Sequence, residues 1–586
     1  MVLVLRFSIV FALISAACLS QSTSGSASSV AAGGTLPPAS PAKTTESVPP
    51  SASAGAPVAP EPNPLGEALA LYRKGSFDEA IGKYQDFLRQ HPESPDAYSG
   101  LVRTYLKEKK VEQAAEFADK GIAQSDSPRM RSARAEVWFR QGKISEAEKE
   151  WVAVINTGYP EARAFLGLAR IRDAIAMYGS AKGLIDKART LDPNDSDIEE
   201  EWVSTLPRAQ RIKYLEDSLA GVNNWKTEER EGVRNYLAYL KERAKQKEES
   251  CRLVSKVTAT ETPLTPLLID PTHLHGYGLT VALNGHKSKL LLDTGASGIL
   301  VTRAIAERAG ISKISQTKVG GIGDKGQRNG YVGVANSIKI GDLEFQNCAV
   351  EVVEQRSVVG DDGLIGADVF EDFLVEIDFP NQKLKLSQLP KRPGEIEPRV
   401  ALNSEEDNSH DSDSPESSAE AKAGEHGAPD AGTTASASRF RDRYISPEMQ
   451  SYTRVFRFGH DLLVPVAIGN VPSKLFLIDT GATMSSISPA AAREVTKVHG
   501  DSDTVVKGIS GKVNDVFSAN KAVLSFGHVR QENQDMISFD TKNLSDDVGT
   551  EISGFLGFTT LRFLDIKIDY RDALIDFRYD PNHFGR

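Results

Sequence analysis

The stretch Leu290-Leu291-Leu292-Asp293-Thr294-Gly295-Ala296-Ser297 returns as Leu475-Phe476-Leu477-Ile478-Asp479-Thr480-Gly481-Ala482-Thr483, so that Asp479 lies 186 residues after Asp293. Each stretch is a short apolar run of the strand type that ends in Asp-Thr-Gly. One such triplet arises by chance about one time in ten in a chain of this length. The repeated context therefore indicates a duplicated structural unit.

The duplication continues downstream in the same order. A short helix is predicted after each triplet, at 302–309 and 489–495, with Ser488 and Pro489 as helix-start residues. Each unit then has a glycine-containing turn and ends with an apolar Gly-x-x-Gly loop and a strand. The two turns are Gly320, Gly321, Ile322 and Gly323 in the first unit, and Gly508, Ile509, Ser510 and Gly511 in the second. Short β-rich runs bounded by Gly and Asn predict two all-β lobes, at 258–390 and 452–580.

This ordered set of motifs resembles the retropepsin-like aspartic peptidases, whose single lobe carries Asp-Thr-Gly-Ala, a glycine-rich flap and an apolar-apolar-Gly loop. The resemblance implies that each unit is a retropepsin-like barrel lobe, and that Asp293 and Asp479 are the catalytic carboxylates. It further implies that Thr294 and Thr480 hydrogen-bond across the lobe junction. Supporting backbone geometry is implied for Gly295, Ala296, Gly481 and Ala482, and flap contacts with substrate for Gly320, Gly321, Ile322, Gly323, Gly508, Ile509 and Gly511.

Paired aspartates suit peptide hydrolysis for a physical reason. Two carboxylates about 3 Å apart cannot both ionise cheaply, so they share one proton and titrate as a pair. One carboxylate then acts as a base toward a water molecule, and the other polarises the scissile carbonyl as an acid. This chemistry requires neither metal nor cofactor, and we expect none. An extended peptide or protein substrate would add a strand between flaps and floor.

Two alternatives to a single intramolecular site stay open. The lobes could be inactive barrels kept for binding, because a fold does not by itself imply a function. Alternatively, each lobe could pair with its own copy in a second chain. Residues 391–440, rich in Ser, Glu, Asp, Ala and Gly, predict a disordered acidic linker between the lobes. A flexible chain of this length spans about 40 Å, which permits the lobes of one chain to face each other.

A different repeat precedes the lobes. Ala80, Ala114, Ala147 and Ala181 are spaced 34, 33 and 34 residues apart, and large residues recur nine positions before the first three. This spacing resembles the tetratricopeptide repeat over 64–197, in which small alanines let paired helices approach closely. Generic helical hairpins with accidental spacing are the alternative. Residues 198–250 predict further capping helices.

The fold class predicted from these patterns is therefore a multidomain chain with an all-α tetratricopeptide-like solenoid followed by two all-β lobes. The repeat array carries no catalytic signature. We predict that it binds a protein partner, and that it is separable from the lobes.

The first residues indicate export. Arg6, an apolar run and Ala16-Ala17-Cys18 are typical of a cleaved signal peptide, assigned here to 1–20. Residues 21–63 are a Ser, Ala, Gly and Pro-rich linker without aromatic residues, which predicts disorder. Cys18 after two alanines resembles a bacterial lipoprotein signal, so membrane attachment through a lipid on Cys18 and simple secretion both stay open. Either route predicts a periplasmic or cell-surface protein.

Composition excludes several other classes. The chain has 586 residues, 40% of them hydrophobic and 25% charged, which is typical of soluble folded domains. The net charge of -11 arises mainly in the linker, and nothing suggests nucleic-acid binding. The three cysteines, Cys18, Cys251 and Cys348, have no metal or redox spacing, and they are too few for a disulfide framework. Cys348 is interpreted as a core residue of a strand.

Overall fold

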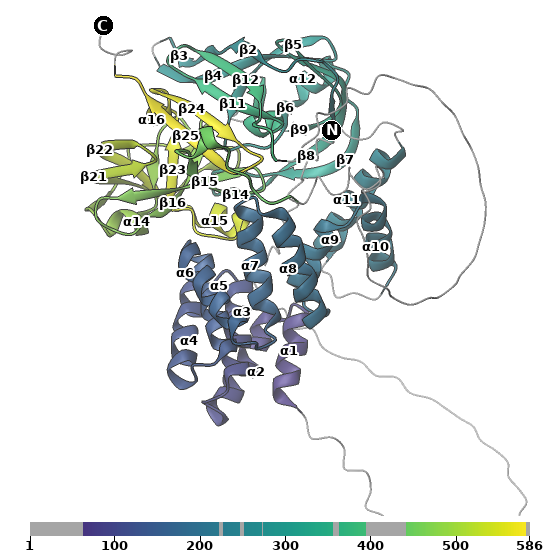
Figure 1. Ribbon diagram of the computed structural model, residues 1–586, viewed down its shortest axis with the longest axis vertical. Helices are drawn as coiled ribbons and strands as arrows, with labels where there is room; N and C mark the ends of the chain where they lie inside the picture. The colour runs from purple at the N-terminus through teal and green to yellow at the C-terminus, as the bar shows by residue number, and fades with distance from the viewer. Residues whose placement is uncertain are drawn as a thin grey trace, which may run out of the picture.

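The computed structural model describes residues 63–221, 227–245, 251–271, 273–354, 362–393 and 441–581. A helical region comes first and two β lobes follow, which confirms the predicted fold class (Figure 1). The predicted signal peptide, nearly all of the 21–63 linker and most of the 391–440 linker lie outside these residues. Within the described ranges, no helix is both long enough and apolar enough to span a membrane.

Four antiparallel helix pairs form the repeat array. The recurring alanines Ala80, Ala114, Ala147 and Ala181 are almost completely buried, where they permit close helix packing. The first helices of the initial three pairs start alike, because Asn63, Ser94 and Ser127 each accept a backbone N–H bond and a proline follows. The helices are α1 (Pro64–Arg73), α2 (Phe77–Gln90), α3 (Pro95–Lys107), α4 (Val111–Gln124), α5 (Pro128–Arg140), α6 (Ile144–Asn156), α7 (Ala162–Ala174) and α8 (Tyr178–Leu191).

Three more helices follow the array, in the region predicted to cap it. They are α9 (Ser196–Thr205), α10 (Arg208–Ala220) and α11 (Thr227–Lys245). The first of them packs against α8, and α11 reaches β7 of the first lobe.

Lobe 1 is a nine-stranded sheet with strand order β1-β9-β6-β10-β5-β4-β8-β7, in which β3 pairs with β4. It starts slightly before the predicted boundary at 258, because β1 already pairs with β9. The elements are β1 (Arg252–Leu253), β3 (Thr265–Asp270), β4 (His273–Leu283), β5 (His286–Asp293), β6 (Ile299–Thr302), α12 (Arg303–Arg308), β7 (Lys313–Val319), β8 (Arg328–Ile340), β9 (Leu343–Val353), β10 (Gly363–Gly366) and η1 (Ala367–Phe370).

Lobe 2 repeats this arrangement in an eight-stranded sheet with strand order β14-β15-β16-β23-β17-β22-β21-β18. Strand β15 also pairs with β21, so the strands of lobe 2 can be followed in the order β22-β17-β23-β16-β15-β21. This order matches β9-β6-β10-β5-β4-β8 of lobe 1, so the duplicated sequence produces a duplicated fold. The elements are β14 (Phe456–Phe458), β15 (Asp461–Ile468), β16 (Lys474–Asp479), β17 (Ser486–Ile487), α14 (Pro489–Arg493), β18 (Val498–Gly500), β19 (Lys507–Gly508), β20 (Gly511–Lys512), β21 (Val516–Phe526), β22 (Val529–Phe539), α15 (Lys542–Val548), β23 (Gly554–Gly557) and α16 (Phe558–Leu561).

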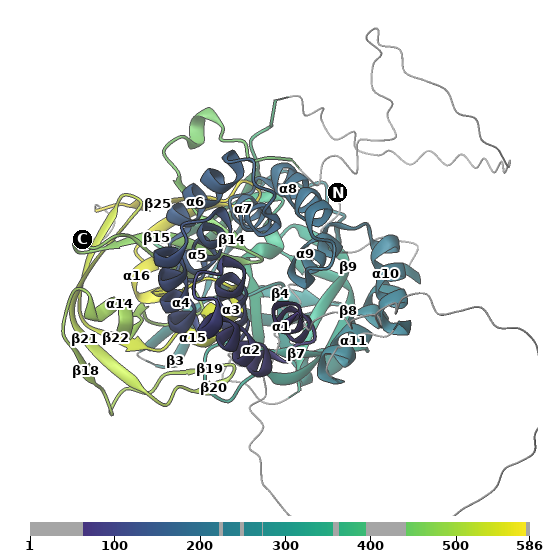
Figure 2. The same ribbon diagram turned by 90° about the horizontal axis from the view of Figure 1, so that it is seen from below.

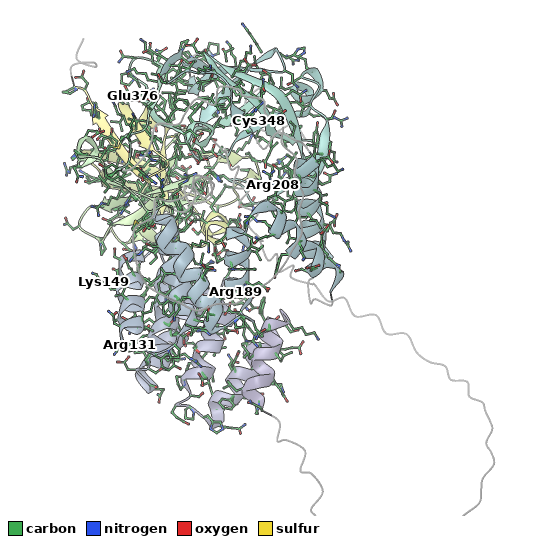
Figure 3. The ribbon with its side chains drawn as sticks, turned by 45° about the vertical axis from the view of Figure 1, so that its right-hand side comes forward. Arg131, Lys149, Arg189, Arg208, Cys348 and Glu376 are labelled. Atoms are coloured by element: carbon green, nitrogen blue, oxygen red, sulfur yellow. A yellow bond between two sulfur atoms is a disulfide. The ribbon has the colours of Figure 1, made fainter. Side chains whose placement is uncertain are left out.

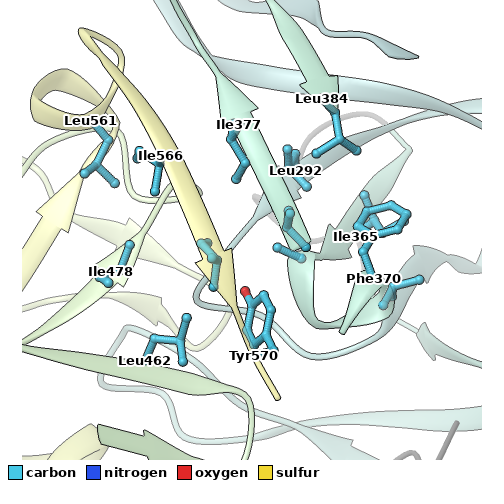
Figure 4. Close-up of a cluster of buried hydrophobic side chains, with 14 of the residues drawn as sticks. Leu292, Ile365, Phe370, Ile377, Leu384, Leu462, Ile478, Leu561, Ile566 and Tyr570 are labelled. Carbon is cyan, nitrogen blue, oxygen red and sulfur yellow. The ribbon is translucent and has the colours of Figure 1, made fainter. Parts of the chain in front are cut away.

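A six-stranded sheet joins the two lobes, in the order β13-β25-β24-β11-β12-β2. Its centre is the antiparallel pair β11 and β24, with Ile377 opposite Ile566. Apolar side chains from both lobes pack against this sheet as one core, including Leu292 of lobe 1 and Ile478 of lobe 2 (Figure 4). The elements are β2 (Thr260–Pro263), β11 (Phe373–Asp378), β12 (Lys383–Gln388), η3 (Pro447–Met449), β13 (Thr453–Arg454), β24 (Leu564–Asp569) and β25 (Leu574–Tyr579).

Cys348 is a core residue of a strand, as predicted, but the sequence did not reveal its disulfide partner. Cys348 is buried in β9, but it forms a disulfide with Cys251, 97 residues earlier in the chain (Figure 3). The bond ties the start of lobe 1 to a long strand of the same lobe. Packed cores are therefore not the sole source of stability in the described part of the chain.

Both ends of the predicted disordered linker are anchored. Arg392, which the sequence places within the linker, is buried and pairs with the carboxylate of Asp572 in lobe 2. Beyond the linker, the backbone N–H of Tyr444 donates to the same carboxylate at 2.9 Å. Asp442 accepts hydrogen bonds from the backbone N–H and Oγ of Ser180 in α8. Arg392, within the predicted disordered linker, is therefore held against lobe 2, and Asp442 and Tyr444, just after it, are held against α8 and lobe 2.

The array packs directly on the lobes (Figures 1 and 2). One hydrophobic cluster contains Phe139 and Trp151 of the array together with Leu475 and Phe555 of lobe 2. Polar contacts surround it: Thr550 Oγ1 donates to the Phe139 carbonyl at 2.6 Å, and Lys542 Nζ donates to the Lys109 carbonyl at 2.7 Å. The array and lobe 2 share a core, which argues against the prediction that the array is separable from the lobes.

Candidate active site

Each Asp-Thr-Gly loop begins where a central strand of its lobe ends. Strand β5 ends at Asp293, and the parallel strand β10 places Gly366 beside it. In lobe 2, β16 ends at Asp479, and the parallel strand β23 places Gly557 beside it. The carboxyl ends of parallel strands meet at one sheet edge, so both loops emerge at the lobe junction.

Two threonines bind the loops to each other. Thr294 Oγ1 donates to the Ile478 carbonyl at 2.7 Å and accepts from the Thr480 N–H at 3.1 Å. Thr480 Oγ1 reciprocally donates to the Leu292 carbonyl at 2.8 Å and accepts from the Thr294 N–H at 3.0 Å. Because both side chains are buried, water does not compete for these bonds, and they fix the relative position of the two aspartates.

The two carboxyl groups meet at the lobe junction, close enough for each to influence the pKa of the other. Backbone donors support each of them: Gly295 N–H donates to Asp293 Oδ1 at 2.8 Å, and Ala482 N–H donates to Asp479 Oδ1 at 2.7 Å. Glycine is required beside them. A Cβ at Gly481 would lie 2.3 Å from Asp293 Oδ2, and a Cβ at Gly295 would lie 2.9 Å from Asp479 Cγ.

Burial makes the ionised pair unfavourable. It raises the pKa of Asp293 well above its usual range, and the neighbouring charge of Asp479 raises it further. Burial also raises the pKa of Asp479, although hydrogen bonds from the Ala482 N–H and from Asp293 oppose this. Because the site disfavours two charges, the pair favours a state with one shared proton and titrates as a unit. The pair holds one acid and one base at the same time.

Further residues that the sequence did not single out hold each loop. In lobe 1, Asp368 accepts from the Gly298 N–H at 2.9 Å and from Ser297 Oγ at 3.1 Å. Lobe 2 has hydroxyls instead: Ser485 and Thr560 share a hydrogen bond, and Ser485 Oγ accepts from the Gly557 N–H at 2.9 Å. The two lobes differ in sequence here, with Ala367-Asp368 in lobe 1 and Phe558-Thr559 in lobe 2. Each lobe therefore holds its Asp-Thr-Gly loop with a different set of side chains.

Ala296 and Ala482 complete the two loops. A Cβ at Gly366 would lie 2.4 Å from the Ala296 carbonyl oxygen, so only glycine fits at this position of β10. In lobe 2 the Ala482 carbonyl accepts from the Phe558 N–H at 2.7 Å.

The two glycine-containing turns meet each other. Ser510 N–H donates to the Ile322 carbonyl at 3.0 Å, and Lys325 N–H donates to the Ser510 carbonyl at 2.8 Å. Gly323 has φ of +128°, and a Cβ there would lie 2.4 Å from the Ser510 carbonyl carbon. The turns thus interlock through backbone bonds that need small residues.

Of the seven flap residues predicted, six lie in this contact. Gly321 faces Ile509, and Gly508 is so close to Ile322 that a Cβ would lie 2.4 Å from the Ile322 carbonyl oxygen. Gly323 and Gly511 touch across the junction. Gly320 instead lies beside Gln327 of its own turn.

A cavity of about 1800 Å³ is lined by Asp293, Asp479 and both turns. Two histidines that sequence reasoning did not assign also line it. His275 Nδ1 lies 2.9 Å from Thr483 Oγ1, so a lobe 1 side chain reaches the loop of lobe 2. His460, beside β15 of lobe 2, lies near Asp368 and Glu351 of lobe 1 and 3.3 Å from Asp461. The strand pairing places these histidines at matching positions in the two lobes.

Comparison with known proteins agrees with this geometry. The family model described as aspartyl protease matches residues 279–369 and 464–560, one segment in each lobe. Each matched segment is thus similar to the aspartyl protease family. The tetratricopeptide repeat model matches residues 65–128, the first two helix pairs of the array. One chain thus combines two segments similar to aspartyl proteases with a segment similar to tetratricopeptide repeats.

Individual relatives are similar over short segments. The UBA domain-containing protein Mud1 of Schizosaccharomyces pombe is 30% identical over 132 residues, which cover 20% of this chain and 39% of that protein. The DNA damage-inducible protein 1 of Chaetomium globosum is 32% identical over 113 residues, covering 19% and 24%. The chain thus spans less than two fifths of the length of these relatives. The crystal structure of aspartic proteinase from Irpex lacteus is 13% identical with a TM-score of 0.32, covering 56% of this chain and 99% of that one.

Proposed function

We propose that this protein is an aspartic endopeptidase whose single site is formed by Asp293 and Asp479 of one chain. The observation that carries the proposal is the buried contact between these two carboxyl groups, locked by the reciprocal bonds of Thr294 and Thr480. A pair that holds one proton supplies an acid and a base at adjacent positions, which is the requirement of this chemistry.

In the proposed reaction, the ionised carboxylate of Asp479 takes a proton from a water molecule bound between the aspartates. The resulting oxygen nucleophile attacks the scissile carbonyl carbon while Asp293 donates its proton to the carbonyl oxygen. A tetrahedral diol forms, and its collapse breaks the C–N bond as the leaving nitrogen receives a proton. Both carboxyl groups then return to the state that shares one proton.

The flaps supply the second requirement, an enclosed site. The Ile322, Ser510 and Lys325 backbone bonds close the turns over the cavity. A substrate chain enters only if these bonds open, and closing them again would exclude water around the reacting carbonyl. Extended peptides would bind beneath the flaps through backbone hydrogen bonds.

A non-catalytic peptide-binding protein is the alternative, and intact aspartates with a shared proton favour catalysis over it. The test is incubation of the purified protein with a mixed peptide library from acidic to neutral pH, with and without a pepstatin-type inhibitor. Inhibitor-sensitive cleavage is expected. Tight peptide binding without any cleavage across this pH range would support the binding protein instead.

We also propose that the protein is exported to the periplasm or cell surface and attached by a lipid on Cys18. The support is the Ala16-Ala17-Cys18 sequence together with the Cys251–Cys348 bond, because disulfides persist mainly in oxidising compartments. Mass spectrometry of the mature N-terminus is the test. A product that starts elsewhere, or membrane association unchanged in Cys18→Ala, would contradict lipid attachment.

A further inference from the structure

The cavity that contains the aspartates extends beyond the lobes to the repeat array. Its lining includes the ends of the first helices of several repeats and the capping helices. Representative residues are Lys74 after α1, Arg140 of α5, Arg170 of α7, Glu200 of α9 and Gly232 of α11. The flaps, the aspartates and the array thus face one continuous space.

The inner face of the array carries an ionic network, and its members Tyr72, Lys107 and Asp197 also line the cavity. Arg163 of α7 is almost fully buried, and it donates to Tyr72 Oη of α1 at 3.0 Å and to Asp197 of α9 at 2.6 Å. Lys107 of α3 pairs with the same aspartate. This network joins the first repeat to the last. The array surface that lines the cavity therefore includes part of this network and the edge of the array that faces the lobes.

The array is held in a fixed position beside the cleft. In addition to the shared core, Arg140 pairs with Asp546 of α15 at 3.5 Å, and the Phe139 ring packs edge-on against Phe458 at 6.2 Å. Helix α11, which also lines the cavity, packs against β7, the strand that leads into the flap of lobe 1. The array therefore lines the cavity as a permanent wall.

This wall makes the two ends of the cleft different. His275 and His460 occupy matching positions in lobes related by an approximate two-fold axis between the aspartates, so they mark opposite ends. The His460 end adjoins Phe458, which contacts the array. At the His275 end, Met484 beside Thr483 is half exposed, with 50% of its surface accessible.

We infer that one polypeptide substrate binds the cleft and the array edge together, with the chain on one side of the scissile bond lying along the array. This inference rests on the proposed function. It assigns the array edge to the substrate itself, as a site for an extended, unfolded segment. Each residue of such a segment adds about 3.3 Å, so lengthening it brings more of it against the array. Long unfolded chains should therefore be better substrates than short peptides.

Gly232 offers a way to obstruct this space without disturbing the fold. It is exposed on α11, lines the cavity, and a Cβ added there would meet no heavy atom within 4 Å. Gly232→Trp would therefore place an indole in the cavity. Gly183→Trp is the matched control, because Gly183 is also an exposed helical glycine with open space around an added Cβ, yet it lies outside the cavity lining. Gly232→Ala adds only a methyl group, so it tests whether α11 tolerates the loss of glycine at this position.

The experiment uses one cleaved short peptide lengthened stepwise on either side of its scissile bond. For the unchanged protein, kcat/KM should rise at least tenfold with lengthening on one side only. Gly232→Trp should lose that gain and still cut the short peptide normally, whereas Gly183→Trp and Gly232→Ala should keep it. Equal gains on both sides, no gain, or a gain unaffected by Gly232→Trp would overturn the inference.

Binding separates this inference from the proposed function. Asp293→Asn can bind the same peptides without cutting them, and fluorescence anisotropy should show the same one-sided increase in affinity. That increase should vanish in Asp293→Asn combined with Gly232→Trp. If no peptide is cut by the native chain but the one-sided affinity is present, the proposed catalysis fails and the inference stands. If affinity is independent of length, the inference fails whatever the activity.

Discussion

Asp293 occupies an environment that opposes its ionisation, and this has a consequence for stability. Burial, with the charge of Asp479 adding to it, raises its pKa well above the value of about 3.9 in an unfolded chain. Above about pH 4 the folded protein therefore binds more protons at this site than the unfolded chain does. The free energy of unfolding consequently falls as the pH rises toward the folded-state pKa.

Asp293→Asn removes this effect, because an amide does not titrate. The variant should be more stable than the native protein at pH 7, by about 1.4 kcal/mol for each pKa unit by which the folded site is raised. The advantage should disappear near pH 3, where the carboxyl is protonated in both states. Urea unfolding at several pH values measures this, with Asp119→Asn on the exposed face of α4 as control. A pH-independent difference would contradict the raised pKa.

At the residue scale, the sequence could predict groups that belong to a local motif. Asp293, Thr294 and Gly295 stand together in a repeated context, so their positions followed from resemblance. Contacts between distant segments gave no such signal: His275 and Thr483 are 208 residues apart. Cys348 lies in an alternating strand, a pattern equally compatible with a core residue, and only the fold shows that Cys251 reaches it.

Among the elements, the flaps depend most strictly on small residues. Gly323→Ala would place a methyl carbon 2.4 Å from the Ser510 carbonyl carbon, at a φ of +128° that side chains rarely adopt. The change should prevent flap closure and lower kcat/KM at least tenfold. The melting temperature should change little, since the turn lies outside the hydrophobic cores. Gly326→Ala is the control, because Gly326 lies in the same loop at a φ of +71° but has open space around an added Cβ. It introduces backbone strain without a clash between the flaps, so the two effects can be told apart.

The disulfide gives a second prediction at this scale. Closing a loop of about 100 residues stabilises a protein by up to about 4.7 kcal/mol in the chain-entropy model, and removing native disulfides typically costs about 2 to 5 kcal/mol. Cys251→Ser combined with Cys348→Ser should lower the free energy of unfolding by such an amount. Reductant should destabilise the native protein equally and leave the double variant unaffected. An unchanged midpoint on reduction would mean that the bond contributes nothing.

The order of elements was largely predictable, because the duplicated strands, short helices and glycine turns follow local patterns. The interlocking of the turns was not predictable in this way. It depends on how β7 and β8 project toward β19 and β20, which only the packing of the two lobes determines.

At the scale of the whole molecule, the array packs as a structural part of the two-lobe region. Deleting residues 64–250 should expose the face of lobe 2 that contains Leu475 and Phe555, which the array buries. The remaining lobes should then melt at a lower temperature, bind a hydrophobic dye and aggregate. Within the intact chain, Phe139→Ala removes one side of this contact and should cost about 3 to 5 kcal/mol. Stable, active isolated lobes would restore the prediction of a separable array made from the sequence.

The pairing of lobes within one chain follows from the shared sheet. Strands β11 and β24 are adjacent at its centre, and Arg392 and Tyr444, on either side of the linker, both bind Asp572. Pairing between chains would have to compete with both.

The central claim is a single dyad formed by Asp293 and Asp479 of one chain. Its most direct test compares peptide cleavage by four samples: Asp293→Asn, Asp479→Asn, the double variant, and a mixture of the two single variants. Asparagine is nearly isosteric with aspartate but cannot act as the base, and circular dichroism will check that each variant is folded. Residues that act as a unit are non-additive. Each single variant should therefore lose cleavage completely, the double variant should be no worse, and the mixture should remain inactive. Substantial cleavage by either single variant alone, or its recovery on mixing, would contradict the account.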